Sequence, residues 1–393
     1  MKLSGIKRVV RELVKLTAFR IIYPLTYKIC CIRKQNLCLT LFCEVRHDYL
    51  TDSFKPIYEE LKRQKKPIQA FYIHNNSGGL SYLLRYFKLC MILPTARNII
   101  IDDTCNLFGA FKLRKGTKLI QTWHSCGAFK KWGYSIAGLS FGQNPKELDR
   151  YPAHNNYNLV TVSSEECIQH FNEAFGFDKS GKNCVKAIGV ARTDFFFHKE
   201  NVEAAYKSLF EACPEAKGKK VLLYAPTYRG DADNAKPPKM FDISALKARL
   251  NGCILLIKQH GFVSDITEIP EDCKDFAFDV SDKLEIEELI AVSDICITDY
   301  SSIIFEYSLF ERPMVFYAYD LDEFYDYRGF YYNYDENFLP GDIARTENEL
   351  FSAVEKAVKN GANIEQVRSF KDKFMGACDG KSTQRIVEYI LED

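Results

Sequence analysis

The sequence lacks most of the signals that mark a secreted, metal-binding or membrane-spanning protein. Its 14 cysteines are scattered without a CxxC pair, which favours free thiols in a reducing compartment over disulfides and makes a zinc site unexpected. No apolar run approaches the roughly 20 residues that a membrane-spanning helix requires, and no signal-peptide core is present. There is also no internal repeat and no low-complexity tract.

Net charge is almost absent as well. The 53 Lys and Arg residues balance 52 Asp and Glu residues to a formal charge of +1. Such a chain has no overall attraction to nucleic acid, which is therefore not an expected partner. Any bound anion must be held by local clusters of side chains.

The chain is long and rich in hydrophobic residues. Its 393 residues are 47% hydrophobic and include 23 Tyr and 29 Phe, which argues for well-packed cores and against disorder. This length accommodates two domains of ordinary size.

Residues 1–34 form a distinct basic segment, in which nine Lys or Arg residues stand against the single acid Glu12. Apolar residues recur there at helical spacing up to Pro24, namely Ile6, Val9, Val10, Leu13, Leu16 and Phe19. We predict an amphipathic helix that associates with an anionic membrane surface. The alternative is a helix that packs on the protein's own body with its charges in water.

Beyond this segment, predicted strands alternate with predicted helices. The strands are expected at 37–43, 68–73, 98–102, 118–123, 159–162, 186–190, 221–225, 254–258, 294–298 and 314–317, and the helices at 52–64, 80–91, 243–250, 284–292, 303–310, 346–360 and 382–391. This alternation predicts an α/β protein with parallel sheets covered on both faces. We place one doubly wound domain at 35–205 and a second at 206–393, with the polar span 197–220 as the crossing between them.

Polar residues collect where several of these strands end. His124 and Lys130 follow one strand, Thr227 and Arg229 a second and His260 a third, and Asp299, Ser301 and Ser302 lie at a strand-to-helix turn. Ligands of open parallel sheets bind outside the carboxyl ends of the strands, and this combination of cations, imidazoles and a helix N-terminus suits a diphosphate.

Each residue also has a simpler interpretation. His260 taken alone is more often a satisfied strand-end histidine, Lys130 a surface charge, and Arg229 a partner of Asp231. Asp299, Ser301 and Ser302 taken alone are more often helix caps. The interpretation as a diphosphate site therefore depends on their convergence.

A series of motifs spread over residues 100–390 resembles one known family. The motifs are Gln121–Gly133 around His124, Val162–Glu165, Gly189–Asp194, Tyr224–Arg229, Lys258–His260, Ile297–Tyr307, Arg312–Met314, Tyr319–Leu321, Arg328–Phe330 and Asp379–Lys381. They are similar, in the same order, to signatures of the CDP-glycerol glycerophosphotransferases of teichoic acid and capsule synthesis, which include CDP-ribitol enzymes.

Three positions depart from the usual pattern of that family. Ser125-Cys126-Gly127 stands where Gly-Thr-Pro commonly follows the histidine, Ala191 stands where Pro is usual, and Gly261 stands where Pro is common. The first departure leaves the choice between glycerol and ribitol open. The other two concern the rigidity of loops more than chemistry.

The resemblance implies a glycosyltransferase-B-type fold, in which two Rossmann-like domains face a cleft. The nucleotide would be held by the C-terminal half, and the acceptor would enter from the N-terminal half. His124 and His260 would be the catalytic residues. The expected donor-binding residues are Lys130, Thr227, Arg229, Thr298, Asp299, Ser301, Ser302 and Glu306, and the expected acceptor-side residues are Arg192, Asp194 and Arg328.

The expected reaction is transfer of glycerol phosphate or ribitol phosphate from its CDP-activated form to a hydroxyl of a lipid-linked saccharide or a growing polyol-phosphate chain, with release of CMP. It would take place at the cytoplasmic face of the membrane on a peripherally attached protein. No cofactor is required by the motifs, although Asp299 leaves room for Mg²⁺. The alternatives are a glycosyltransferase that uses a sugar nucleotide and a non-catalytic, membrane-attached protein that binds an anionic polymer.

Overall fold

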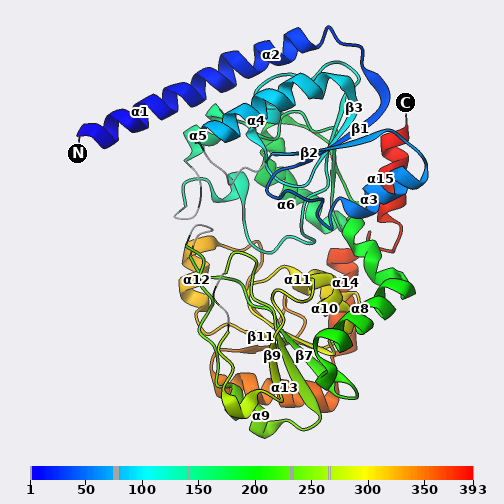
Figure 1. Ribbon diagram of the computed structural model, residues 1–393. Coiled ribbons are helices and arrows are strands. Elements are labelled where there is room, and N and C mark those ends of the chain that lie inside the picture. Colours follow the sequence, from blue (N-terminus) through cyan, green and yellow to red (C-terminus); the bar gives the residue numbers. More distant parts are fainter. Residues whose placement is uncertain are drawn as a thin grey trace. The chain divides into compact units, whose positions relative to one another are not determined.

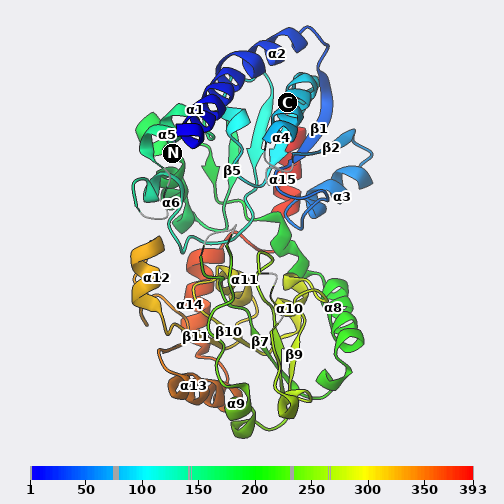
Figure 2. The same ribbon diagram turned by 60° about the vertical axis from the view of Figure 1, so that its left-hand side comes forward.

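The computed structural model describes residues 2–73, 79–139, 142, 144–230, 234–263, 265 and 267–392, with side chains left out at 2–8, 79–80 and 326–328. The chain divides into two compact units. Unit 1 comprises Met1–His124, Trp132–Asp194 and Lys381–Asp393, and unit 2 comprises Ser125–Lys131 and Phe195–Gly380. Each unit is built on a parallel sheet (Figures 1 and 2), as the sequence predicts.

The sheet of unit 1 has the strand order β2-β1-β3-β4-β5-β6. Its strands are β1 (Asn36–Glu44), β2 (Ile68–Tyr72), β3 (Ala96–Ile101), β4 (Lys118–Gln121), β5 (Leu159–Thr161) and β6 (Val185–Lys186). Its helices are α1 (Lys2–Thr17), α2 (Tyr23–Cys30), α3 (Lys55–Arg63), α4 (Gly79–Ile92), α5 (Pro145–Arg150), α6 (Glu165–Phe175), α7 (Phe177–Ser180) and α15 (Ser382–Leu391).

Side chains alternate between the two faces of this sheet, as the pleat of a strand requires. Leu41 and Ile99 enter the core that also contains Tyr86 of α4 and Phe171 of α6. Their neighbours in sequence point the other way and meet the buried residues of α3 and α15 in a second core, which contains Phe42, Ile57, Leu61, Ile100, Ile120, Ile386, Val387 and Ile390. Helices therefore cover both faces, which is why these strands are almost uniformly apolar.

The sheet of unit 2 has the strand order β12-β11-β10-β7-β8-β9. Its strands are β7 (Lys220–Tyr224), β8 (Cys253–Ile257), β9 (Ala277–Asp279), β10 (Ile295–Thr298), β11 (Met314–Tyr317) and β12 (Asp342–Ala344). Its helices are α8 (Lys199–Ala212), α9 (Ile243–Arg249), α10 (Ile286–Val292), α11 (Ile303–Ser308), α12 (Leu321–Arg328), α13 (Glu347–Asn360) and α14 (Ile364–Met375). The chain first builds outward from β7 through β8 to β9 and then returns to add β10, so the strand order reverses between β7 and β10.

The observed units differ from the predicted domains 35–205 and 206–393. Helix α15 ends the chain but belongs to unit 1, because its buried residues complete the core beneath β1, β3 and β4. The segment Ser125–Lys131 belongs to unit 2.

The predicted crossing 197–220 contains helix α8, which buries Ala205 and Leu209. This helix was not predicted from the sequence, because many charged residues surround the short apolar face of α8.

The N-terminal helices bury some of their apolar side chains and expose others. Ala18, Phe19, Tyr23 and Tyr27 are buried, and the Tyr23 hydroxyl donates a hydrogen bond to the Leu83 carbonyl of α4 at 3.1 Å. A second set of apolar side chains is exposed in the same stretch: Val9, Val10, Leu13, Val14, Ile21, Ile22, Leu25 and Ile29. In the described part of the chain, no helix combines the length and apolar character needed to cross a bilayer.

Asp194, which we expect at the acceptor side, contacts the first turn of α15. Asp194 is 4% exposed, and its carboxylate accepts hydrogen bonds from the backbone N–H groups of Ser382 at 3.0 Å and Thr383 at 2.7 Å. These are groups of the first helical turn, which lack partners inside the helix, and a negative charge is favourable there.

We therefore expect Asp194→Ala to lower the free energy of unfolding by about 2–4 kcal/mol, because two charge-assisted hydrogen bonds are lost at a buried site. Urea denaturation followed by circular dichroism would measure this. Asp178→Ala removes an exposed carboxylate of the same unit and serves as the control. Equal stability of the two variants would contradict the anchoring role.

Candidate active site

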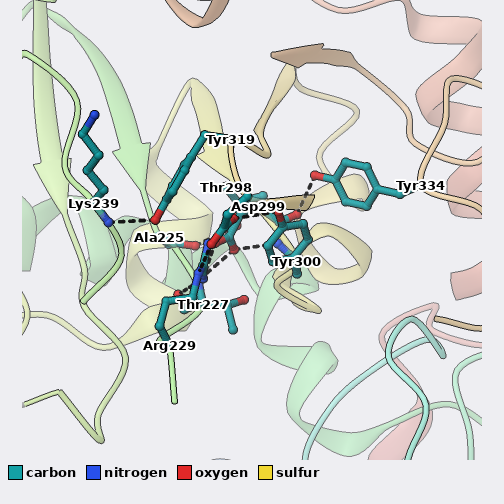
Figure 3. A network of polar contacts seen from close by, with 10 residues as sticks. Ala225, Thr227, Arg229, Lys239, Thr298, Asp299, Tyr300, Tyr319 and Tyr334 are labelled. Carbon is teal, nitrogen blue, oxygen red and sulfur yellow. Dashed lines mark hydrogen bonds and ion pairs between the residues drawn. The ribbon is translucent and has the colours of Figure 1, made fainter. Parts of the chain in front are cut away.

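The strand ends at the reversal point of unit 2 are joined by polar contacts (Figure 3). The Thr227 N–H donates to Oδ1 of Asp299 at 2.8 Å, and the Thr298 hydroxyl donates to the Ala225 carbonyl at 2.7 Å. These bonds tie the loop after β7 to the end of β10. Ligands of open parallel sheets bind at such a reversal of strand order, so the predicted donor residues lie where the topology places a ligand.

Arg229 lies at the centre of this network. Its guanidinium pairs with both carboxylate oxygens of Asp320, at 2.6 and 3.0 Å, and with Oδ2 of Asp299 at 3.0 Å. It also lies over the rings of Tyr300 and Phe324, 5.2 and 5.3 Å from their centroids. Burial disfavours the charged guanidinium, but Asp299 and Asp320 outweigh this effect and raise the pKa of Arg229.

This arrangement changes the interpretation of Arg229. The structure places its donors on two carboxylates and on the Thr227 carbonyl, at 2.6 Å, whereas the sequence predicts contact with a diphosphate. The alternative partner Asp231 lies outside the described residues. Bidentate pairing of this kind fixes the angle as well as the distance between its partners, so these contacts hold the Arg229 guanidinium in a defined orientation against Asp320.

The serine hydroxyls and the Glu306 carboxylate near α11 do not behave as ordinary helix caps or as a solvent-exposed charge. Ser302 precedes the helix but makes no side-chain capping hydrogen bond, and Ser301 Oγ accepts only a long one, of 3.4 Å, from the Ile303 N–H. Glu306 is 2% exposed, so it is not a solvated helix carboxylate. Among the described residues, the buried Thr227 hydroxyl has no hydrogen-bond partner. A buried polar atom of this kind favours a site completed by a ligand.

His260 follows β8 and is held by its own loop. Its Nδ1 accepts a hydrogen bond from the Phe262 N–H at 3.2 Å, and its ring lies near those of Tyr228 and Phe262, with centroid distances of 4.7 and 4.8 Å. Because Nδ1 accepts, the proton of the neutral imidazole is on Nε2. His260 can therefore donate a hydrogen bond from Nε2.

Lys130 belongs to the segment that joins unit 2. Its backbone pairs with Phe330 in an antiparallel bridge, and the ring of the preceding Phe129 stacks on Phe330 at 4.9 Å. Gly127 in the same segment has φ of +65°, and a Cβ there would lie 2.4 Å from the Phe305 ring. Glycine meets both demands, so the departure from the usual family motif at Ser125-Cys126-Gly127 supplies, at position 127, the residue that this close approach requires.

In unit 1, His124 follows β4 and has the opposite tautomer. Its Nδ1 lies 2.9 Å from the carbonyl oxygen of Asp102 at the end of β3. A carbonyl only accepts, so Nδ1 carries the proton and Nε2 carries the lone pair of the neutral ring. The preceding Trp123 has φ of +57° and stacks on the His124 ring at 4.6 Å. A buried tryptophan in the left-handed region is strained, which is typical of functional sites.

Arg192, expected at the acceptor side, supports the backbone of His124. Its Nη1 donates to the His124 carbonyl at 3.1 Å and pairs with Oδ2 of Asp52 at 3.0 Å. The side chain of Arg328, the third predicted acceptor-side residue, lies outside the described residues. The described part of the chain holds no group of three His, Cys, Asp or Glu residues arranged to bind a metal ion.

Comparison with known proteins decides the family. A model of the CDP-glycerol:poly(glycerophosphate) glycerophosphotransferase family matches residues 25–392. The chain belongs to this glycerophosphotransferase family. The predicted family and the predicted enzyme class, a CDP-polyol phosphotransferase, are thereby confirmed.

Individual members of the glycerophosphotransferase family are similar over most of their length. The chain is 36% identical over 352 residues to a teichoic acid ribitol-phosphate primase of Bacillus spizizenii, covering 88% of each protein. It is 32% identical over 287 residues to a teichoic acid glycerol-phosphate transferase of Staphylococcus aureus, covering 70% of this chain and 72% of that protein. A structure of the wall teichoic acid polymerase TagF matches with a TM-score of 0.74 at 25% identity, covering 99% of this chain and 95% of that one.

Three carboxylates without a predicted role lie near predicted site residues in one unit or the other. Asp320 was part of the quoted motif Tyr319–Leu321 but received no role. Glu44 is the last residue of β1 and Asp102 directly follows β3, so the same strand-end rule that found His124 would have found them. Thr51 donates from its hydroxyl to Asp102 Oδ2 at 2.8 Å. Burial, followed by the nearby Glu44, raises the pKa of Asp102 well above its ordinary value.

This shift predicts how stability depends on pH. The folded protein keeps a proton on Asp102 that the unfolded chain releases above about pH 3.9, so this contribution to stability is lost as pH rises from there toward the folded pKa. Asparagine mimics the neutral carboxyl. We therefore expect Asp102→Asn to be more stable than wild type at about pH 8, with the difference shrinking at about pH 5.

Urea denaturation at both pH values would measure the effect, with the exposed Asp48→Asn as the control. Because the His124 ring binds the backbone of residue 102, turnover should be retained. A variant that is destabilised equally at both pH values would contradict a protonated Asp102.

Proposed function

We propose that this protein transfers ribitol phosphate from CDP-ribitol to a hydroxyl of a lipid-linked saccharide or a growing polyol-phosphate chain, with release of CMP. The observation that carries the mechanism is the pair of opposite tautomers. His124 presents an unprotonated Nε2, as a general base must, and His260 presents an Nε2–H, as a group that stabilises a departing phosphate must.

The transfer proceeds by direct displacement. Nε2 of His124 takes the proton of the acceptor hydroxyl while its oxygen attacks the phosphorus that bears the polyol. The bond from that phosphorus to the bridging oxygen breaks, and CMP leaves with the electron pair, which the Nε2–H of His260 stabilises by a hydrogen bond. Alignment and charge neutralisation supply most of the barrier reduction in such reactions.

The donor occupies the strand ends of unit 2. The Thr227 hydroxyl, Ser301, Ser302 and Lys130 contact the diphosphate, and Glu306 accepts hydrogen bonds from the ribose. Arg229 acts through Asp299 and Asp320, which hold the loops after β10 and β11 in place. A Mg²⁺ ion at Asp299 would have to displace this ion pair, so a resident metal remains outside the proposal. The proposed architecture is the glycosyltransferase-B type, with the acceptor entering from the unit that carries His124.

Ribitol is proposed over glycerol because the relative named for ribitol phosphate is more similar to this chain than the one named for glycerol phosphate, 36% against 32% identical, and matches a larger share of it. A donor panel of CDP-ribitol, CDP-glycerol and UDP-sugars, followed by product mass, would test the assignment. Release of UDP or UMP with sugar transfer, and no release of CMP, would identify a conventional glycosyltransferase instead.

The histidines make the mechanism testable. We expect His124→Ala to lose roughly 10²-fold or more of the rate of CMP release, because a general base contributes at least that much. His260→Ala should lose a comparable factor while binding acceptor as wild type does. His198→Ala, which removes an exposed imidazole at the start of α8, should turn over normally. A His124→Ala variant as fast as the His198 control would contradict the assigned base.

We further propose that the exposed apolar side chains of α1 and α2 rest on an anionic membrane surface at the cytoplasmic face. Leu13 is 61% and Leu25 is 54% exposed, and Arg11 and Lys15 share the segment with them. Apolar burial and attraction to anionic lipid add together in such helices.

Leu13→Glu/Leu25→Glu should therefore weaken binding to phosphatidylglycerol vesicles about tenfold or more, measured by co-sedimentation. Leu139→Glu/Ile364→Glu alters exposed residues elsewhere and should bind as wild type does. Vesicle binding that is equal in the two variants would show that these helices serve only to pack against unit 1.

A further inference from the structure

Unit 1 contains a cavity that the transfer mechanism does not use. Its volume is about 550 Å³, and Tyr134, His154, Phe175, Phe177, Lys179 and Lys182 are among the residues that line it. These residues come from the end of α6, from α7 and from the loops beside them. A cavity of this size falls in the range of small-molecule sites.

Two ammonium groups on its wall are held in place. The Lys179 Nζ lies 5.2 Å from the centroid of the Tyr134 ring. The Lys182 Nζ lies 5.4 Å from that of Phe177 and donates to the Asn155 carbonyl at 2.7 Å. Within the described part of the chain, no carboxylate oxygen lies within 4.0 Å of either ammonium group. Each ammonium group thus lies near the face of an aromatic ring, and Lys182 also donates to a carbonyl, while neither charge has a direct counter-ion.

The balance of charge on the lining favours an anion. Asp149 is its acidic member and accepts a hydrogen bond from the Tyr134 hydroxyl at 3.2 Å, so two lysines face one carboxylate. Burial lowers the pKa of Lys182, which means that the protonated, charged amine is less favourable at this position than in water. A bound anion would stabilise the charged amine, because a nearby opposite charge favours the protonated form.

Part of the lining is polar but uncharged. His154 is 8% exposed, and burial lowers its pKa to about 3, so its ring is neutral. Its Nδ1 lies 3.0 Å from the Tyr157 hydroxyl, which leaves Nε2 as the second polar atom of the ring. Together with Asn155 and Ser180, which also line the cavity, this ring suits the hydroxyl groups of a polyol.

The cavity also lies close to the candidate base. The Phe175 ring stacks on His154 at 4.2 Å on one side and meets Trp123 at 5.4 Å on another. Trp123 in turn stacks on His124 at 4.6 Å. A single aromatic side chain therefore separates the cavity from the Trp123–His124 pair, and all four rings belong to unit 1.

We propose that this cavity binds a phosphodiester-linked polyol unit of the acceptor or product chain, away from the reacting hydroxyl. The phosphate lies between the amines of Lys179 and Lys182, and the polyol hydroxyls contact His154, Asn155 and Ser180. The site rests on the proposed function, because only a polyol-phosphate transferase presents such a chain to this unit. This site would keep the polymer bound to the protein between successive transfers of polyol phosphate.

The test uses the full-length protein and a soluble poly(ribitol phosphate) oligomer of several units, without donor. Calorimetry should find that Lys179→Gln/Lys182→Gln binds this oligomer about tenfold or more weakly than wild type, since two charge-assisted contacts to phosphate are lost. The apparent KM for the oligomer should rise, while the KM for the CDP-activated donor stays unchanged. Lys182→Arg keeps the charge and should retain most of the affinity.

The matched control is Lys62→Gln/Lys186→Gln, which removes two exposed lysines of the same unit. Equal oligomer affinity in the two double variants would overturn the proposal. A Lys179→Gln/Lys182→Gln variant that no longer binds phosphatidylglycerol vesicles but keeps full affinity for the oligomer would also overturn the proposal. In that case the cavity would hold a phospholipid headgroup. A wild type that binds the oligomer through Lys179 and Lys182 but releases no CMP would refute the proposed function and leave the binding site standing.

Discussion

The loops at the carboxyl ends of the unit 2 strands depend on one partly buried cation. Arg229 follows β7, Asp299 follows β10 and Asp320 follows β11, so a single guanidinium joins the ends of three neighbouring strands. Removing such charges from water is costly, and an ion pair of this kind adds little net stability compared with a well-packed apolar core. What it adds is geometry, because bidentate pairing fixes where the loops of the ligand-binding edge lie. The surrounding aromatic rings exclude water and strengthen these contacts.

The two histidines illustrate how backbone contacts determine chemical role. Both imidazoles follow a parallel strand, and both could serve as acid or base in principle. The hydrogen bond from Nδ1 to the Asp102 carbonyl in one case, and from the Phe262 N–H to Nδ1 in the other, assigns them opposite tautomers. Neither partner is a side chain of a recognisable motif. Substitutions that move these short loops would therefore change which ring nitrogen carries the proton while leaving both histidines in the sequence.

Much of the fold follows directly from the sequence. The buried strands β4, β8 and β10 are short apolar runs in the sequence, and His124, His260 and Asp299 lie beyond their carboxyl ends, as predicted. Short or charged elements were harder to find. Strand β12 spans only three residues, and α8 hides its two buried residues among charged ones. The partners of Arg229 and Asp194 could not be predicted, because Asp320 and Ser382 meet them only after the sheets have formed.

The route of the chain through the two units has a consequence for dissecting the protein. The polypeptide changes unit after His124, Lys131, Asp194 and Gly380, so neither unit is encoded by one uninterrupted stretch. A fragment ending at residue 194 would lack α15 and expose the apolar sheet face around Phe42 and Ile100. A fragment starting at residue 195 would lack Phe129 and its stacking on Phe330. Separate expression of either unit would therefore require grafting these distant pieces onto the gene, for example by circular permutation.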